Sequence, residues 1–99
     1  MEKLFVYGTL RIPEVQQRVF GRETSGTPDR LPGYRVVFKD FATGSYPMAI
    51  PDEAYAVEGE VLEVNDTELR LIDIYETSAY ARIRVMLDSG TEAWVYTAP

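Results

Sequence analysis

Glu76 is the residue of this chain whose type and position best suit proton transfer. The chain has no histidine and no cysteine, so acid–base chemistry must come from Asp, Glu, Lys or Tyr. On a helical wheel, Glu76 falls inside an apolar arc and Asp73 falls just past its edge. The arc consists of Leu69, Leu71, Ile72, Ile74 and Tyr75. Burial and the nearby helix C-terminus would both raise the pKa of Glu76 toward that of a general base. The alternative is a carboxylate at a frayed helix end that points to water.

The segment Tyr7-Gly8-Thr9-Leu10 is a second candidate, because it directly follows a short apolar run. A glycine at the end of a strand lets the backbone turn and present consecutive N–H groups to a ligand. Such a nest suits a carboxylate or a developing oxyanion. The alternative is an ordinary turn that ends a strand, with Leu10 packed inward.

A third candidate is a set of polar aromatic and arginine side chains that could line a small pocket. The set consists of Tyr46, Pro47, Tyr80, Arg82 and Tyr96. We favour the plainer interpretation, in which the tyrosines belong to the core with a solvated tip. In that interpretation Arg82 and Arg84 pair with glutamates across the strands.

The elements that must position these residues are mostly strands. Strand-forming runs are predicted at 3–7, 34–38, 57–64, 80–87 and 92–96. Asp88-Ser89-Gly90 predicts a tight turn between the last two strands, which form a hairpin. Gly59 indicates a bulge or a close backbone approach. Residues 24–33 are rich in turn formers, and residues 40–56 are expected to be irregular.

Two short helices are predicted between the strands. One begins at Pro13, runs to Phe20 and ends at Gly21. The other begins after Asn65, which forms a capping box with Glu68, and runs to about Glu76. The expected fold class is therefore α+β, with a small, mostly antiparallel, barrel-like sheet and two short helices.

Composition and charge limit the class of protein. With 99 residues, the chain is expected to form one domain, residues 1–99. The first 49 residues carry seven basic and five acidic side chains, and the other 50 carry three and eleven. Acidic chains are repelled by phosphate backbones, so no nucleic-acid partner is expected. No apolar run is long enough for a membrane span or a signal peptide, which favours a cytoplasmic protein. Without Cys or His, no disulfide and no transition-metal site are expected.

The candidate residues occur in an order that resembles the gamma-glutamylcyclotransferase-like family. The opening segment Leu4–Leu10 is similar to the family's N-terminal signature, and Leu71–Glu76 resembles the segment that carries its catalytic glutamate. Further similar segments are Tyr46-Pro47 with Ala49-Ile50, Val57–Val61, Tyr80–Arg82 and Val95-Tyr96. The resemblance covers nearly the whole chain. It departs after the glutamate, where the family commonly has glycine and this chain has Thr77-Ser78.

This resemblance implies an enzyme that converts a gamma-glutamyl amine or amide into 5-oxoproline and free amine, without metal or cofactor. It implies Glu76 as the catalytic acid/base and Tyr7, Gly8, Thr9 and Leu10 as the substrate-binding loop. The alternative is a non-catalytic module that binds a small metabolite or a protein with the same pocket. The sequence leaves open which amine is released and what the oligomeric state is.

Overall fold

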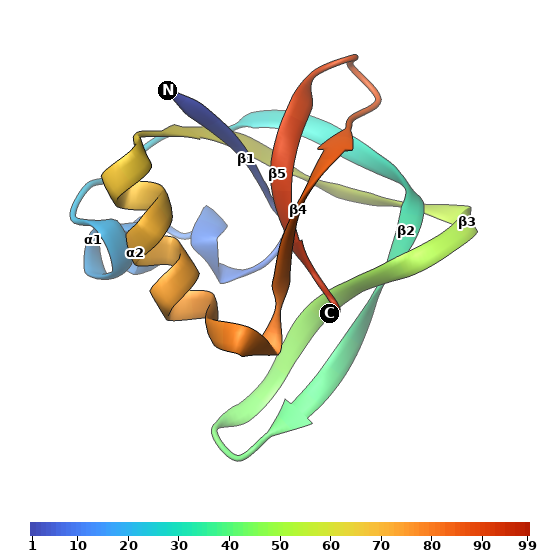
Figure 1. Ribbon diagram of the computed structural model, residues 1–99, viewed down its shortest axis with the longest axis horizontal. Coiled ribbons are helices and arrows are strands. Elements are labelled where there is room, and N and C mark those ends of the chain that lie inside the picture. The colour runs from blue at the N-terminus through green and yellow to red at the C-terminus, as the bar shows by residue number, and fades with distance from the viewer.

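A five-stranded sheet, curled into a half-barrel, forms the centre of the computed structural model, which describes all 99 residues (Figure 1). Its strands are β1 (Glu2–Val6), β2 (Thr27–Phe41), β3 (Gly44–Val64), β4 (Ala81–Met86) and β5 (Glu92–Thr97). Their order across the sheet is β2-β3-β1-β5-β4. The β1–β5 pair is parallel, as is a single β3–β5 bridge at Ala49 and Thr97, and the other pairs are antiparallel. The predicted α+β class and barrel-like sheet are confirmed.

Two α-helices lie together beside the sheet, α1 (Pro13–Phe20) and α2 (Asp66–Glu76) (Figure 1). Pro13 occupies the first turn of α1, and Gly21 ends that helix in the left-handed conformation with φ 80°. Asn65 and Glu68 form both hydrogen bonds of the predicted capping box. Short 3₁₀ turns, η1 (Thr9–Arg11) and η2 (Thr77–Ala79), follow β1 and α2. None of these helices has the length and apolar character needed to span a membrane.

The prediction that residues 40–56 are irregular is wrong, as is the turn-rich interpretation of most of 24–33. These residues belong to β2 and β3, which pair along nearly their whole length. Proline is tolerated there because β2 is an edge strand, and Pro47 and Pro51 lie where β3 has few other partners. The register shifts near Gly33, whose φ of 80° accommodates the irregularity.

The core has two parts, and the helices cover the one that holds Leu4, Leu62 and Ile72. Gly59 confirms the predicted close approach, because a Cβ there would lie 2.5 Å from the carbonyl oxygen of Val6. The apolar arc predicted for α2 is too wide. Leu69 and Ile72 are buried, but Leu71, Tyr75 and Ile74 are 41%, 40% and 73% exposed. The neighbouring elements cover one narrow face of the helix, and Glu76 lies on it.

Candidate functional site

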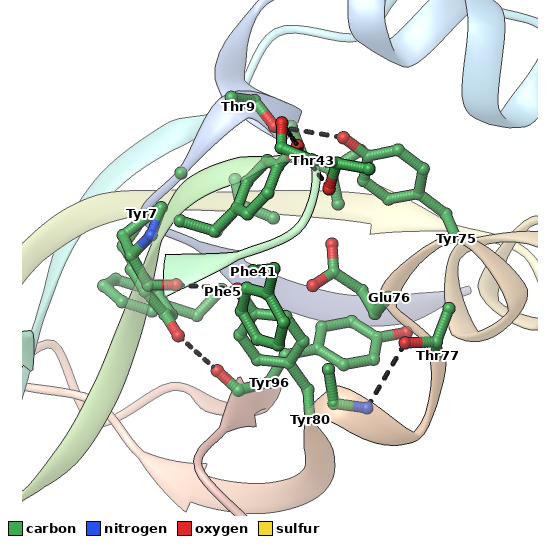
Figure 2. Close-up of a pocket in the computed structure, with 16 residues that line it drawn as sticks. Phe5, Tyr7, Thr9, Phe41, Thr43, Tyr75, Glu76, Thr77, Tyr80 and Tyr96 are labelled. Atoms are coloured by element: carbon green, nitrogen blue, oxygen red, sulfur yellow. Dashed lines mark hydrogen bonds between the residues drawn. The ribbon is translucent and has the colours of Figure 1, made fainter. Parts of the chain in front are cut away.

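One cavity of about 290 Å³ lies where the end of β1, the η1 turn, the β2–β3 turn and the end of α2 meet (Figure 2). All five predicted site residues line it: Tyr7, Gly8, Thr9, Leu10 and Glu76. The other lining residues are Phe5, Val6, Phe41, Thr43, Tyr46, Pro47, Tyr75, Thr77, Ala79, Tyr80 and Tyr96. The volume is at the lower end of the range for small-molecule sites.

The Glu76 carboxyl points into the middle of this cavity (Figure 2). Burial raises its pKa from 4.5 to about 7. No side chain or backbone group donates a hydrogen bond to it. Glu68, about two turns earlier on the same helix, shows the opposite behaviour: a 2.7 Å ion pair with Arg22 lowers its pKa although the residue is buried. Glu76 is thus an unpaired carboxyl that can gain or lose a proton near neutral pH.

The η1 turn and Gly8 before it include three residues that line the cavity, Gly8, Thr9 and Leu10. The turn's own hydrogen bonds run from the N–H of Arg11 to Gly8 and from the N–H of Ile12 to Thr9, at 3.2 and 2.9 Å. The N–H groups of Gly8, Thr9 and Leu10 therefore have no partner within the turn. Gly8 has φ −121°, so it is not in the left-handed region, and its small size leaves room for Pro47. The Leu10 side chain is buried, as in the plainer prediction.

The Tyr7 hydroxyl serves the scaffold rather than the cavity. It donates a hydrogen bond to the carbonyl of Tyr96, at 2.5 Å, and accepts one from the N–H of Ala49, at 2.9 Å. These two bonds join β5 to β3 beneath the site. Burial raises the Tyr7 pKa, so the hydroxyl keeps its proton. Tyr7 lines the cavity as predicted, while its hydroxyl holds two strands together.

The favoured interpretation of the third set of residues is only partly right. Tyr46, Pro47, Tyr80 and Tyr96 do line the cavity, and the Tyr80 hydroxyl donates to the carbonyl of Pro47 at 2.8 Å. Burial raises the pKa of Tyr80 to about 12, so it too remains protonated. Tyr96 lines the cavity and, because it is only 6% exposed, also belongs to the core.

Arg82 lies outside the cavity. It forms two hydrogen bonds with Asp73, at 2.7 and 3.0 Å, and stacks on Trp94. Asp73 also accepts a 2.6 Å bond from the Tyr96 hydroxyl. Burial raises the pKa of Asp73, but the bonds from Arg82 and Tyr96 outweigh it and the net shift is downward. Asp73 therefore anchors α2 to the sheet, and Arg82 pairs with it rather than with a cross-strand glutamate.

Sequence reasoning missed several lining residues, among them Phe5, Phe41, Thr43 and Tyr75. Thr43 carries no signal, because it lies in a turn that was expected to be irregular. Tyr75 precedes Glu76, and its hydroxyl lies 3.3 Å from the Thr9 side-chain oxygen, so it links the end of α2 to the η1 turn. The long β2–β3 pairing is what carries Phe41 and Thr43 to the cavity.

Thr77, directly after Glu76, has a backbone conformation that favours glycine. Its φ is 63° and its ψ −172°, and it is the one residue other than glycine with positive φ. This region is strained for a β-branched residue, by about 1–3 kcal/mol. The geometry explains why glycine suits this position and what the departure at Thr77 costs.

Replacing Thr77 with glycine is expected to stabilise the fold by about 1 kcal/mol. Relief of the strain exceeds the greater flexibility of glycine in the unfolded chain, about 0.5–1 kcal/mol, and the loss of a side-chain bond to Ala79 N–H. The melting temperature should rise on the order of 4–8 °C. Thr77→Ala, which removes the hydroxyl but keeps the Cβ, should give no such gain. A melting temperature of Thr77→Gly below that of the natural protein would show that the Thr77 backbone is not strained.

Comparison with known proteins places the chain among a group with this architecture. Residues 4–99 match the family described as gamma-glutamyl cyclotransferase, AIG2-like. "AIG2-like protein C" of Arabidopsis thaliana is 35% identical over 94 residues, which cover 90% of this chain and 52% of that protein. The chain thus spans about half the length of this relative.

Solved structures agree with the fold. A solution structure of an Arabidopsis thaliana protein superposes with a TM-score of 0.84 at 26% identity, covering 98% of this chain and 68% of that one. A structure described as gamma-glutamyl cyclotransferase also gives a TM-score of 0.84, at 20% identity, covering 99% and 66%. At that identity the second likeness shows the fold alone.

Proposed function

The chain belongs to the gamma-glutamyl cyclotransferase, AIG2-like family, and we propose that residues 1–99 act as one catalytic domain. The family predicted from the sequence motifs is thereby confirmed. The proposed reaction converts a gamma-glutamyl amine or amide into 5-oxoproline and the free amine. The observation that carries this proposal is the unpaired Glu76 carboxyl, with its pKa near 7, in the same small cavity as Gly8, Thr9 and Leu10, whose N–H groups have no partner within the η1 turn.

Glu76 supplies the proton transfers that the reaction needs. In water near neutral pH the substrate's α-amine is mostly an ammonium ion, which is not a nucleophile. The ionised Glu76 takes one of its protons, and the freed nitrogen attacks the γ-carbonyl carbon to close a five-membered ring. The bond from this carbon to the leaving nitrogen then breaks as Glu76 gives that proton to the nitrogen, which leaves as a neutral amine. The ring nitrogen still holds two protons, and the regenerated Glu76 carboxylate takes one of them to leave the neutral lactam. This second proton ends on the released amine, which is an ammonium ion in water, so the proposed reaction balances without a cofactor.

The η1 turn supplies the complementary partial positive charge. The N–H groups of Gly8, Thr9 and Leu10 can hold the substrate's α-carboxylate or stabilise the oxyanion of the tetrahedral intermediate. One such donor is typically worth about 3 kcal/mol of barrier. Because the attack is intramolecular, a cavity that keeps the substrate folded lowers the barrier further.

Glu76 also argues against the alternative of a non-catalytic binding module. A module that binds an anion through backbone N–H groups gains nothing from a second negative charge in the same cavity. The discriminating experiment incubates the protein with gamma-glutamyl amines and gamma-glutamyl amino acids and measures 5-oxoproline by mass spectrometry. Formation above the spontaneous rate with at least one substrate is expected. If 5-oxoproline forms only at the spontaneous rate with every substrate, the proposed enzymatic activity is wrong.

The pH dependence of kcat/KM provides a second test. Glu76 must be ionised to accept a proton, and its pKa in the free protein is about 7. Below pH 7 the value of kcat/KM should therefore fall about tenfold per pH unit, and it should level off above pH 7. An ordinary exposed glutamate would place this change near pH 4.5 instead. A profile that is flat between about pH 5.5 and 7 would contradict the proposed base.

A further inference from the structure

Three aromatic rings, those of Phe41, Tyr46 and Tyr75, line the cavity near Glu76 and are called the aromatic wall below. The β2–β3 turn contributes Phe41 and Tyr46, whose ring centres lie 6.0 Å apart at an angle of 54°. The end of α2 contributes Tyr75, which is 40% exposed. Figure 2 shows the Glu76 carboxyl with Phe41, Tyr75 and Tyr80 around it. Because Phe41, Tyr46 and Tyr75 are not buried, each keeps part of its surface free to contact a ligand.

The same wall carries no positive charge. None of the sixteen lining residues is Lys or Arg. The nearest guanidinium along the η1 turn, that of Arg11, donates to the Gly8 carbonyl. The side chain of Lys39, which pairs with Tyr46 across the strands, is exposed and outside the lining. The three N–H groups of the turn suffice for one carboxylate. A second carboxylate on the substrate would meet uncharged rings and the negative charge of the ionised Glu76, which repels it, with no cation among the lining residues to pair with it.

We propose that this aromatic wall binds the leaving amine, and that it selects amines whose substituent is flat, uncharged and aromatic. The proposal rests on the proposed function and names its substrate class. Rings of this kind pack on another aromatic group in offset or edge-to-face arrangements. A cationic amine is disfavoured, because a positive charge beside Glu76 would stabilise the ionised carboxylate and weaken it as a base. An amino acid as leaving group is disfavoured by its carboxylate.

Three synthetic substrates separate these contributions. Gamma-glutamyl-phenethylamine and gamma-glutamyl-phenylalanine differ by one carboxylate, and gamma-glutamyl-ethylamine lacks the ring. We expect kcat/KM for the phenethylamine to exceed that for phenylalanine on the order of 100-fold and that for ethylamine about tenfold. A fourth substrate, 1,5-diaminopentane with one nitrogen gamma-glutamylated and the other a free ammonium, should have a lower kcat/KM than gamma-glutamyl-phenethylamine. Equal or higher kcat/KM for the phenylalanine or the ammonium substrate would overturn the proposal.

A matched pair of variants tests whether Phe41 determines the preference for the aromatic substrate. Phe41→Ala should lower the ratio of kcat/KM between the phenethyl and ethyl substrates severalfold, mainly through KM. Phe38→Ala removes a 70% exposed ring from the same strand outside the cavity and should leave that ratio unchanged. An unchanged ratio in Phe41→Ala would overturn the assignment of the wall.

Failure of the subsite and failure of the function give different results. If all four substrates form 5-oxoproline at similar rates, the enzyme stands and the proposed selectivity is wrong. If none forms 5-oxoproline, the proposed function is wrong. Calorimetry then decides the subsite: the protein should still bind the phenethylamine more tightly than phenylalanine, and the reverse order would overturn the subsite as well.

Discussion

Replacing Glu76 with glutamine is expected to lower turnover by a factor on the order of 10²–10⁴. Glutamine keeps the size and the hydrogen-bonding shape of the side chain but cannot accept the proton of the substrate's ammonium. Substrate binding should be largely kept, because in the proposed complex the η1 turn and the aromatic wall provide most of the contacts. The loss should therefore be in kcat rather than in KM, measured by 5-oxoproline formation under saturating substrate.

The same variant should be more stable than the natural protein at alkaline pH. Glu76 has a higher pKa when folded, about 7, than in the unfolded chain, about 4.5. Its ionised form is therefore disfavoured by folding, and the natural protein loses stability as the pH rises from 4.5 to 7. Glutamine has no such loss. The gain in unfolding free energy should be larger at pH 8 than at pH 5, by at most about 2.5 kcal/mol.

Glu63→Gln is the suitable control, because Glu63 is an exposed carboxylate on β3 whose side chain makes no ion pair. It should change neither turnover nor the pH dependence of stability. Asp73, which sequence reasoning placed just outside the apolar arc, is unsuitable as a mild control because it binds both Arg82 and Tyr96. Turnover near the natural level in Glu76→Gln, or a loss that merely follows unfolding, would show that Glu76 is structural.

Local signals made α2 and its glutamate predictable from sequence. The capping box at Asn65 sets where the helix begins, and the helical period then places Glu76 between Leu69 and Ile72 on the packed face. Asp88-Ser89-Gly90 and the alternation around it define the β4–β5 hairpin in the same way. Each of these patterns lies within about twenty residues, so no distant contact is needed to interpret it.

The cavity wall depends on distant contacts, and sequence reasoning could not supply it. Prolines at 47 and 51 argue against a strand unless its neighbours are known. Only the edge position of β2 and the few partners of β3 there make them acceptable. That pairing carries Phe41, Thr43 and Tyr46 to the cavity. The exposure of Leu71 and Ile74 likewise depends on which elements cover α2, which the helical period does not determine.

Replacing Tyr7 with phenylalanine should destabilise the fold by about 2–3 kcal/mol. The change leaves the N–H of Ala49, which is fully buried, without an acceptor, and the carbonyl of Tyr96 without its donor. A buried backbone group that loses its partner costs about 1–3 kcal/mol. β3 and β5 are otherwise joined by a single bridge at Ala49 and Thr97 and by the 3.0 Å bond from the N–H of Ala98 to the carbonyl of Ala49. The melting temperature should fall on the order of 10–20 °C.

Tyr55→Phe is the matched control, because Tyr55 on β3 is 58% exposed and its hydroxyl makes no hydrogen bond. Its melting temperature should stay within about a degree of the natural protein, since surface changes of this kind have little effect. If the Tyr7 hydroxyl acts through the strands, activity in Tyr7→Phe should fall in step with the folded fraction, measured by circular dichroism at the assay temperature. A lower kcat/KM in fully folded Tyr7→Phe, at an unchanged melting temperature, would instead show that the hydroxyl contacts the substrate.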